Sequence, residues 1–197
     1  GIEVRGGNPR VERCAVIGNT SWFNAGLWVQ GGAVASVTNC LFTGNSSTGG
    51  AMAVRVQDAS ARIVNCTITG NGQGSAPQSV IATGGATVMD NSIVWGNAVG
   101  PTGQVSAGIN VSYSNIEGGY PGVSNLNTAP GFVSTTNFRL SAGSPCIDSG
   151  DNAALPPGAH GRHGARGGLE GDGRVDGRAA LARAHDLGDG HGQASER

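Results

Sequence analysis

The sequence predicts an all-β solenoid, in which short strands from successive turns of the chain stack in parallel. Three observations support this prediction. A nine-residue segment recurs at a fixed spacing, apolar or small residues alternate inside each copy, and most copies end in Gly-Asn. A fixed period of this length is typical of proteins whose repeats pack only against their neighbours.

The repeated segment occurs four times without gaps, at residues 11–19, 37–45, 63–71 and 89–97. The equivalent positions Cys14, Cys40, Cys66 and Ser92 are equally spaced, and a weaker copy centred on Ser114 follows after a slightly shorter interval. Alternation with period two indicates strands rather than helices. Gly and Asn are the residue types that most readily turn the chain with a positive φ.

A repeat of the length that separates Cys14 from Cys40 fits one turn of a right-handed parallel β-helix, with three short strands and their turns. We expect about five rungs, each rising about 4.8 Å. The remaining strands are predicted from residues 31–37 and 49–56, which begin with Gly-Gly-Ala. An antiparallel sandwich is disfavoured, because it needs frequent hairpin turns and no such identical repeat.

Two kinds of side chain are expected to stack in structural ladders along the solenoid. The thiols of Cys14, Cys40 and Cys66 form one ladder, too widely spaced for disulfides and too straight for a tetrahedral zinc site. Amides form the others, because stacked Asn side chains hydrogen-bond to one another and to the turns. The amide ladders comprise Asn39, Asn65 and Asn91, with Arg13 in the first copy, and Asn19, Asn45, Asn71 and Asn97.

The chain divides into repeats at 1–124, a capping segment at 125–155, and a low-complexity tail at 156–197. An open stack needs a cap, and we expect its apolar residues to cover the last rung: Phe132, Phe138, Leu140 and Ile147. The tail is rich in Gly, Ala, Arg and Asp and is predicted to be disordered, or the product of a shifted reading frame in GC-rich DNA. The chain begins at Gly1 without an initiator Met, so we expect a fragment or a processed product.

The Asn-Cys-x-apolar-x-Gly-Asn copies and the Gly-Gly-Ala stretches resemble bacterial right-handed parallel β-helix repeat proteins. Residues 42–45, Phe-Thr-Gly-Asn, are similar to short motifs of polymorphic outer-membrane proteins. Residues 138–150 resemble the closing segment of secreted bacterial β-helix proteins. The resemblance implies this fold and a secreted or cell-surface location, but no single activity, because the superfamily contains lyases, hydrolases and adhesins.

Composition excludes several classes of partner. The chain has no Lys, a formal net charge of −1 and no long apolar run, so we expect neither nucleic-acid binding nor a transmembrane segment. We predict a monomer without cofactor or metal, whose partner is a polysaccharide or another cell-surface molecule. Candidate binding residues are the aromatic and charged side chains Trp22, Trp95, Asp58, Arg55 and Arg62.

No catalytic residue is assigned in the repeats, because all four His lie after residue 156 and the carboxylates are scattered. Glu12 and Asp90 share a repeat position but are three rungs apart, about 14 Å, too far for a glycosidase pair. The sequence therefore favours a non-catalytic scaffold for adhesion or glycan contact. The alternatives are the C-terminal part of a pectate-lyase-like polysaccharide lyase or a glycoside hydrolase with catalytic rungs upstream, and a purely structural stalk.

Overall fold

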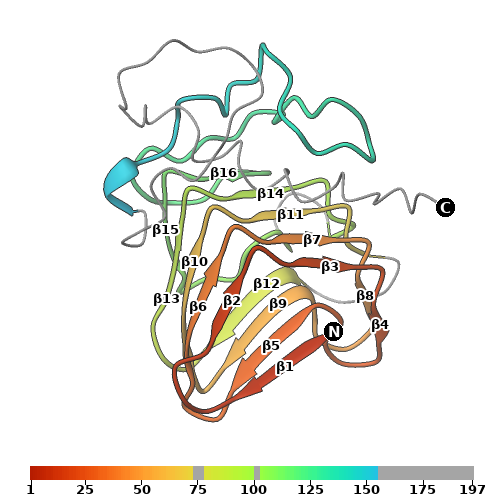
Figure 1. The fold of residues 1–197 in the computed structure, drawn as a ribbon, viewed down its shortest axis with the longest axis vertical. Helices are drawn as coiled ribbons and strands as arrows, with labels where there is room; N and C mark the ends of the chain where they lie inside the picture. The colour runs from red at the N-terminus through yellow and green to blue at the C-terminus, as the bar shows by residue number, and fades with distance from the viewer. Residues whose placement is uncertain (73–77, 100–102, 155–197) are drawn as a thin grey trace, which may run out of the picture.

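The computed structural model describes residues 1–72, 78–99 and 103–154. They form a parallel β-solenoid built from three sheets that run along its axis (Figure 1). The predicted disorder of residues 156–197 lies outside the described residues. No helix in the described ranges is long and apolar enough to cross a membrane.

Each turn of the chain contributes one strand to each of three sheets. Sheet A contains β1 (Ile2–Arg5), β5 (Leu27–Gln30), β9 (Ala51–Gln57) and β12 (Gln78–Thr83). Sheet B contains β2 (Arg10–Glu12), β6 (Val34–Thr38), β10 (Ser60–Val64), β13 (Thr87–Asp90) and β15 (Asn110–Ser112). Sheet C contains β3 (Ala15–Ile17), β7 (Leu41–Thr43), β11 (Thr67–Thr69), β14 (Ile93–Trp95) and β16 (Asn115–Ile116).

The strands make about four turns, and β15 and β16 add part of a fifth to sheets B and C. This agrees with the predicted parallel β-helix, although the stack has slightly fewer rungs than the expected five or so. The short strands β4 (Thr20–Ser21) and β8 (Ser46–Ser47) pair with each other after sheet C. The 3-10 helix η2 (Asn152–Ala154) lies near the end of the described chain.

Register follows the sequence repeat in sheets B and C. In sheet C, Val16 pairs with Phe42, Phe42 with Ile68, Ile68 with Val94 and Val94 with Ile116, at the same offsets that separate the copies of the repeat in the sequence. These central side chains point inward and form much of the core. Sheet A departs from the repeat, because Glu3 pairs with Trp28, one position short of the period, and Trp28 pairs with Arg55, one position beyond it.

Backbone conformation at two places bends the chain around the core. Between sheets B and C, the five residues before the Cys or Ser position have φ between 49° and 56°: Arg13, Asn39, Asn65, Asn91 and Tyr113. After sheet C, the glycines that precede the closing asparagines have φ between 62° and 67°: Gly18, Gly44, Gly70 and Gly96. The left-handed conformation is accessible to Gly and tolerated by Asn, which explains the recurrent residue types.

The C-terminal end of the stack is closed by residues that follow β16. Leu126 forms a parallel bridge with Asn115, so pairing continues slightly past the predicted boundary at 124. Tyr120 packs against the core, and its hydroxyl donates to the carbonyl of Ser106 at 2.8 Å. These contacts close the end of the described stack.

The predicted position of the capping residues over the last rung is wrong for Phe132 and Leu140. With Cys146, they pack against Ile93 and Trp95 on the outer face of sheet C. The reason is that Ile93 and Trp95 flank the inward-facing Val94 and therefore point outward, where two large apolar side chains need cover. Phe138 contacts Phe132 edge to face at 5.5 Å, and this segment lies beside sheet C in Figure 1.

Candidate functional site

Three aromatic rings and one cation gather on the outer face of sheet A in the first turns of the solenoid. Trp22, whose surface is 79% exposed, stacks on Phe23 with ring centroids 6.4 Å apart and planes at 22°. Phe23 meets Trp28 edge to face at 5.8 Å, and the guanidinium of Arg55 lies 4.6 Å from the centroid of Phe23. We call Trp22, Phe23, Trp28 and Arg55 the aromatic platform.

The loop that carries Trp22 and Phe23 is held against the next turn of the chain. The hydroxyl of Ser47 donates to the carbonyl of Phe23 at 2.8 Å, and that of Thr48 to the carbonyl of Trp22 at 3.1 Å. A Cβ atom on Gly50 would lie 1.8 Å from the Phe23 carbonyl oxygen, so only glycine permits this close approach. The Gly-Gly-Ala motif therefore helps to position the platform.

Polar side chains surround the platform on the outer face of sheet A. Glu3 pairs with Arg5 at 2.7 Å and accepts a hydrogen bond from Gln30. Arg55 Nε donates to Gln57 Oε1 at 3.2 Å, which fixes the plane of the guanidinium beside the Phe23 ring. The two terminal nitrogens of Arg55 have no acceptor among the described residues, so none of these residues competes with a ligand for them.

The structure separates the other residues that the sequence singled out for binding. Trp95 is only partly exposed and packs in the cluster of Ile93 and Cys146, which favours a packing role. Asp58 is exposed on the turn between β9 and β10, with φ of 48°. Asp58 forms no ion pair with Arg55 or Arg62 in the described structure, because Arg62 pairs with Asp90 at 3.2 Å and Arg55 contacts Phe23 and Gln57.

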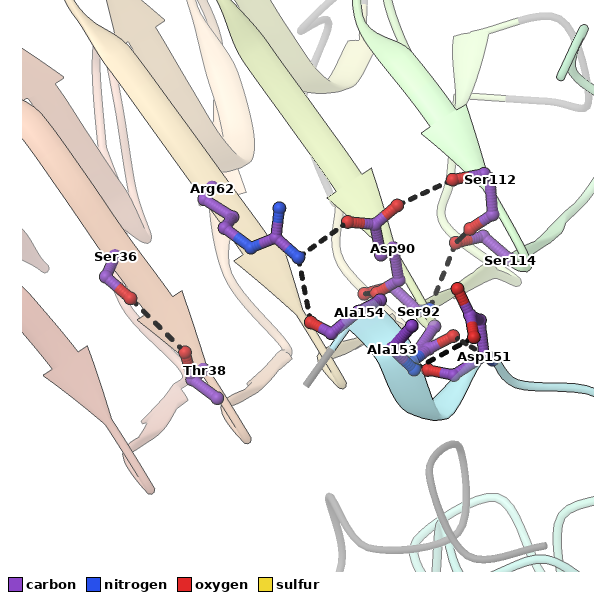
Figure 2. Close-up of polar contacts among 11 residues, drawn as sticks. Ser36, Thr38, Arg62, Asp90, Ser92, Ser112, Ser114, Asp151, Ala153 and Ala154 are labelled. Atoms are coloured by element: carbon purple, nitrogen blue, oxygen red, sulfur yellow. Dashed lines mark hydrogen bonds and ion pairs between the residues drawn. The ribbon is translucent and has the colours of Figure 1, made fainter. Parts of the chain in front are cut away.

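Asp90 is the centre of a second polar cluster, on the outer face of sheet B (Figure 2). Its side chain is almost buried, accepts a hydrogen bond from Ser112 at 2.6 Å and contacts Arg62. Both carboxylate oxygens are therefore occupied. Glu12 occupies the position in β2 that corresponds to Asp90 in β13, but two strands lie between β2 and β13. Glu12 pairs with Arg10 instead, so it cannot act together with Asp90.

The asparagines that follow sheet C form a continuous hydrogen-bonded ladder. The backbone N–H and Nδ2 of each one donate to Oδ1 of the next, at 2.9 to 3.1 Å, along Asn19, Asn45, Asn71 and Asn97. Asn97 then donates to Gln104 at 2.8 Å, and Gln104 donates to Glu117 at 2.8 Å. This ladder joins the turns structurally and offers no free group to a ligand in its interior.

The second row of amides is less continuous than the first. Asn65 Nδ2 donates to Asn39 Oδ1 at 3.2 Å. Asn91 does not extend the row, because its side chain exchanges two hydrogen bonds with the backbone of Asp151, each 2.7 Å long. Asn65 Oδ1 is left buried without a partner in the described structure.

All four cysteines lie in the described ranges and are free thiols. In the ladder of Cys14, Cys40 and Cys66, each Sγ donates to the carbonyl two residues earlier, at 3.3 to 3.4 Å. Ser92 and Ser114 continue the ladder with the same contact at 2.9 Å. Burial raises the pKa of Cys66 well above its ordinary value and also raises the pKa of Cys146, so both thiols are protonated at neutral pH.

A hollow of about 690 Å³ lies at the C-terminal end of the described stack, with Ile109, Ile116 and Tyr120 among its lining residues. Its buried polar residue, Gln104, is already bonded to Asn97 and Glu117. In the described ranges no three His, Cys, Asp or Glu residues are grouped to hold a metal ion. The aromatic platform is therefore the best candidate for contact with a ligand.

Sequence reasoning named Trp22 and Arg55 but missed Phe23 and Trp28. The repeat period would place Trp28 beside Val54, whereas the longer connection between β5 and β9 shifts the register by one residue and brings Arg55 beside it. The Trp-Phe pair at 22–23 was the available signal, since two adjacent aromatic residues in a loop of a chain with few aromatics indicate a cluster.

Comparison with known proteins identifies the family. The family model described as right handed beta helix region matches residues 1–139. No curated protein and no solved structure matches the chain significantly. Together with the parallel three-sheet solenoid, the match shows that the chain belongs to the right-handed β-helix family.

Proposed function

We propose that the protein is a non-catalytic module that contacts glycans through the aromatic platform on sheet A. The observation that carries the proposal is the exposed Trp22 ring, which stacks on Phe23, while Phe23 also contacts Trp28 and the guanidinium of Arg55, whose terminal nitrogens have no acceptor among the described residues. Aromatic faces pack against the apolar C–H faces of sugar rings. Amide and guanidinium donors hydrogen-bond to the hydroxyl groups around them.

The rigidity of the solenoid supports this role. Trp28 and Arg55 come from paired strands, and the backbone of Phe23 is bonded to Ser47. A site formed on such a scaffold loses little conformational entropy when it binds. We further propose that the protein acts outside the cell as a monomer, in an adhesive or scaffolding protein of the bacterial surface.

The test measures binding of the full chain to a panel of neutral and acidic oligosaccharides by isothermal titration calorimetry. We expect Trp22→Ala to weaken binding about fivefold or more, because it removes the most exposed ring of the platform. Ile17→Ala is the matched control, since Ile17 is also exposed but lies on sheet C. Equal binding by wild type and W22A, or absence of binding to every oligosaccharide, would contradict the proposal.

A polysaccharide lyase role makes a different prediction. The carboxylate of Asp90 pairs with Arg62 and accepts a hydrogen bond from Ser112. The carboxylate of Glu3 pairs with Arg5. We therefore expect no unsaturated product when the chain is incubated with polyuronates and Ca²⁺. A sustained rise in the absorbance of unsaturated uronate would show catalysis and overturn the non-catalytic assignment.

A further inference from the structure

Residues 128–154, which we call the strap, fold back along the outside of the solenoid. The strap is bonded largely to itself: Val133 donates to Arg139, Ser141 to Gly131 and Ile147 to Ser144, all from backbone to backbone. Among the described residues, no backbone-to-backbone hydrogen bond joins the strap to residues 1–127. This distinguishes the strap from every turn of the solenoid, which is attached to its neighbours by ladders of such bonds.

Side chains of the solenoid hold the strap at three places within the part of the chain that the structure describes. Asn115 bonds to the backbone of Thr128 and, at 3.0 Å, to Sγ of Cys146. Asn91 exchanges two hydrogen bonds with Asp151, and Arg62 donates to the carbonyl of Ala154 at 2.8 Å. Figure 2 shows the region where the end of the strap lies against Arg62 and Asp90.

The surface beneath the strap is apolar on sheet C and polar on sheet B. Ile93 is fully buried although it points outward, and Trp95 is partly covered, because Phe132, Leu140 and Cys146 pack on them. Asp90 retains only 6% exposure on the neighbouring sheet. The strap therefore seals a lateral face of the last complete turn without contributing a strand to sheet A, B or C.

We propose that the strap is a latched cover, which lifts from sheets B and C while the solenoid remains folded, and that Asn91 is its latch. Segments with few apolar contacts and no shared backbone ladder open at lower free energy than the core to which they are attached. Lifting exposes the apolar pair Ile93 and Trp95, frees the backbone-bonded amide of Asn91 and uncovers the thiol of Cys146. The same motion leaves Cys40 and Cys66 enclosed by the turns around them.

The cysteines of the protein provide the measurement. Under native conditions the full chain is treated with N-ethylmaleimide, and modification of each cysteine is followed by peptide mass spectrometry. Cys14 is partly exposed, Cys146 lies under the strap, and Cys40 and Cys66 lie in the core. We expect modification of Cys14 first, Cys146 next, and Cys40 and Cys66 last and together.

A pair of matched variants tests the latch. Asn91→Gly removes both bonds to Asp151 and keeps a residue that accepts φ of 51° without strain. Asn39→Gly makes the same change at the equivalent bend, where the side chain has no contact with the strap. We expect N91G to accelerate modification of Cys146 about tenfold or more, and N39G to leave it within about twofold of wild type.

Two results would overturn the proposal. Modification of Cys146 at the rate of Cys40 and Cys66 in the wild-type chain would show that the strap opens only when the solenoid unfolds. Equal acceleration by N91G and N39G, or by neither, would show that Asn91 is not the latch. If N91G fails to fold, the order of modification in the wild-type chain still decides whether the strap opens alone.

Discussion

Asn71 connects three successive turns through one buried side chain. Its Oδ1 accepts two hydrogen bonds from Asn45, while its Nδ2 donates to the carbonyl of Phe42 and to Asn97. None of these groups has access to water in place of the amide, because Asn45 and Asn71 are fully buried. The ladder therefore stabilises the solenoid mainly through the high cost of leaving such groups unpaired.

We predict that Asn71→Ala lowers the free energy of unfolding by about 3 kcal/mol or more, because it leaves two donors of Asn45 and the Phe42 carbonyl unsatisfied. Urea denaturation followed by circular dichroism measures this loss. Asn19→Ala is the control at the partly exposed end of the ladder, where water replaces lost contacts, and it should cost about 1 kcal/mol. Equal losses in the two variants would contradict this account.

The buried thiol of Cys66 makes stability depend on alkaline pH. Burial raises the pKa of Cys66 in the folded chain well above its ordinary value, so the unfolded chain loses this proton first as pH rises. The stability that the protonated thiol contributes is therefore complete below the pKa of the thiol in the unfolded chain and declines as pH rises above that value.

Cys66→Ser removes this titration and should fold, because Ser92 and Ser114 occupy equivalent positions with the same hydrogen bond to the carbonyl two residues earlier. We predict that stability falls more between pH 7.5 and pH 10 in wild type than in C66S, by about 1 kcal/mol or more. Free energies of unfolding from urea titrations at both pH values measure the difference. Parallel declines in the two proteins would show that Cys66 does not ionise differently on unfolding.

At the scale of the element, the bend between sheets B and C is a repeated left-handed residue. Three of its five positions are Asn, but the first is Arg13 and the last is Tyr113, with φ of 55° and 49°. Side chains other than Asn and Gly are strained in this conformation. The bends are thus equal in geometry and unequal in intrinsic stability.

We predict that Arg13→Asn raises the free energy of unfolding by about 0.5 to 1 kcal/mol, since Arg13 is exposed and the gain comes from relief of backbone strain. Asn39→Val, which puts a β-branched residue at the same bend, should lower it by about 1 to 2 kcal/mol. Differential scanning calorimetry measures both changes. A loss of stability in R13N would show that the Arg side chain makes a compensating contact.

The sequence predicted the strands and bends correctly where the same residue type recurs at equivalent positions of each repeat. The spacing of Cys14, Cys40 and Cys66 predicted the register of sheets B and C, because their strands and bends have constant length. Sheet A was less predictable, since the connection from Thr20 to Leu27 differs in length from that after Ser46. The neighbours of Trp28, and with them the aromatic platform, therefore could not be read from the period.

At the scale of the whole molecule, the solenoid and the strap are stabilised differently. Phe42 is fully buried in the continuous core, whereas Phe132 is partly buried between the strap and sheet C. In the sequence, the signal for a covering segment was that two large apolar side chains, Ile93 and Trp95, point outward from sheet C. The origin of the cover could not be predicted, because Cys146 and Asn115 are far apart in the sequence and meet outside the repeat.

We predict that Phe42→Ala lowers the free energy of unfolding by about 3 to 5 kcal/mol, because it leaves a cavity that every neighbouring turn shares. Phe132→Ala should leave the main unfolding transition nearly unchanged and reduce hydrogen-exchange protection of the strap. Chemical denaturation and hydrogen exchange with mass spectrometry separate the two effects. A large shift of the main transition in F132A would show that strap and solenoid unfold as one unit.

Because the same dipeptide occurs at successive bends, the solenoid can be lengthened by whole repeats. Inserting a second copy of residues 40–65 after Asn65 creates the junction Asn-Cys, which already occurs at Asn39–Cys40 and Asn65–Cys66. The insert would extend the hydrogen-bonded columns by one layer, about 4.8 Å, without altering any existing dihedral angle. Gene duplication in units of one whole repeat therefore has a ready structural outcome here, whereas an insertion of another length must be accommodated in a connection between strands, as the shorter interval between Val94 and Ile116 is.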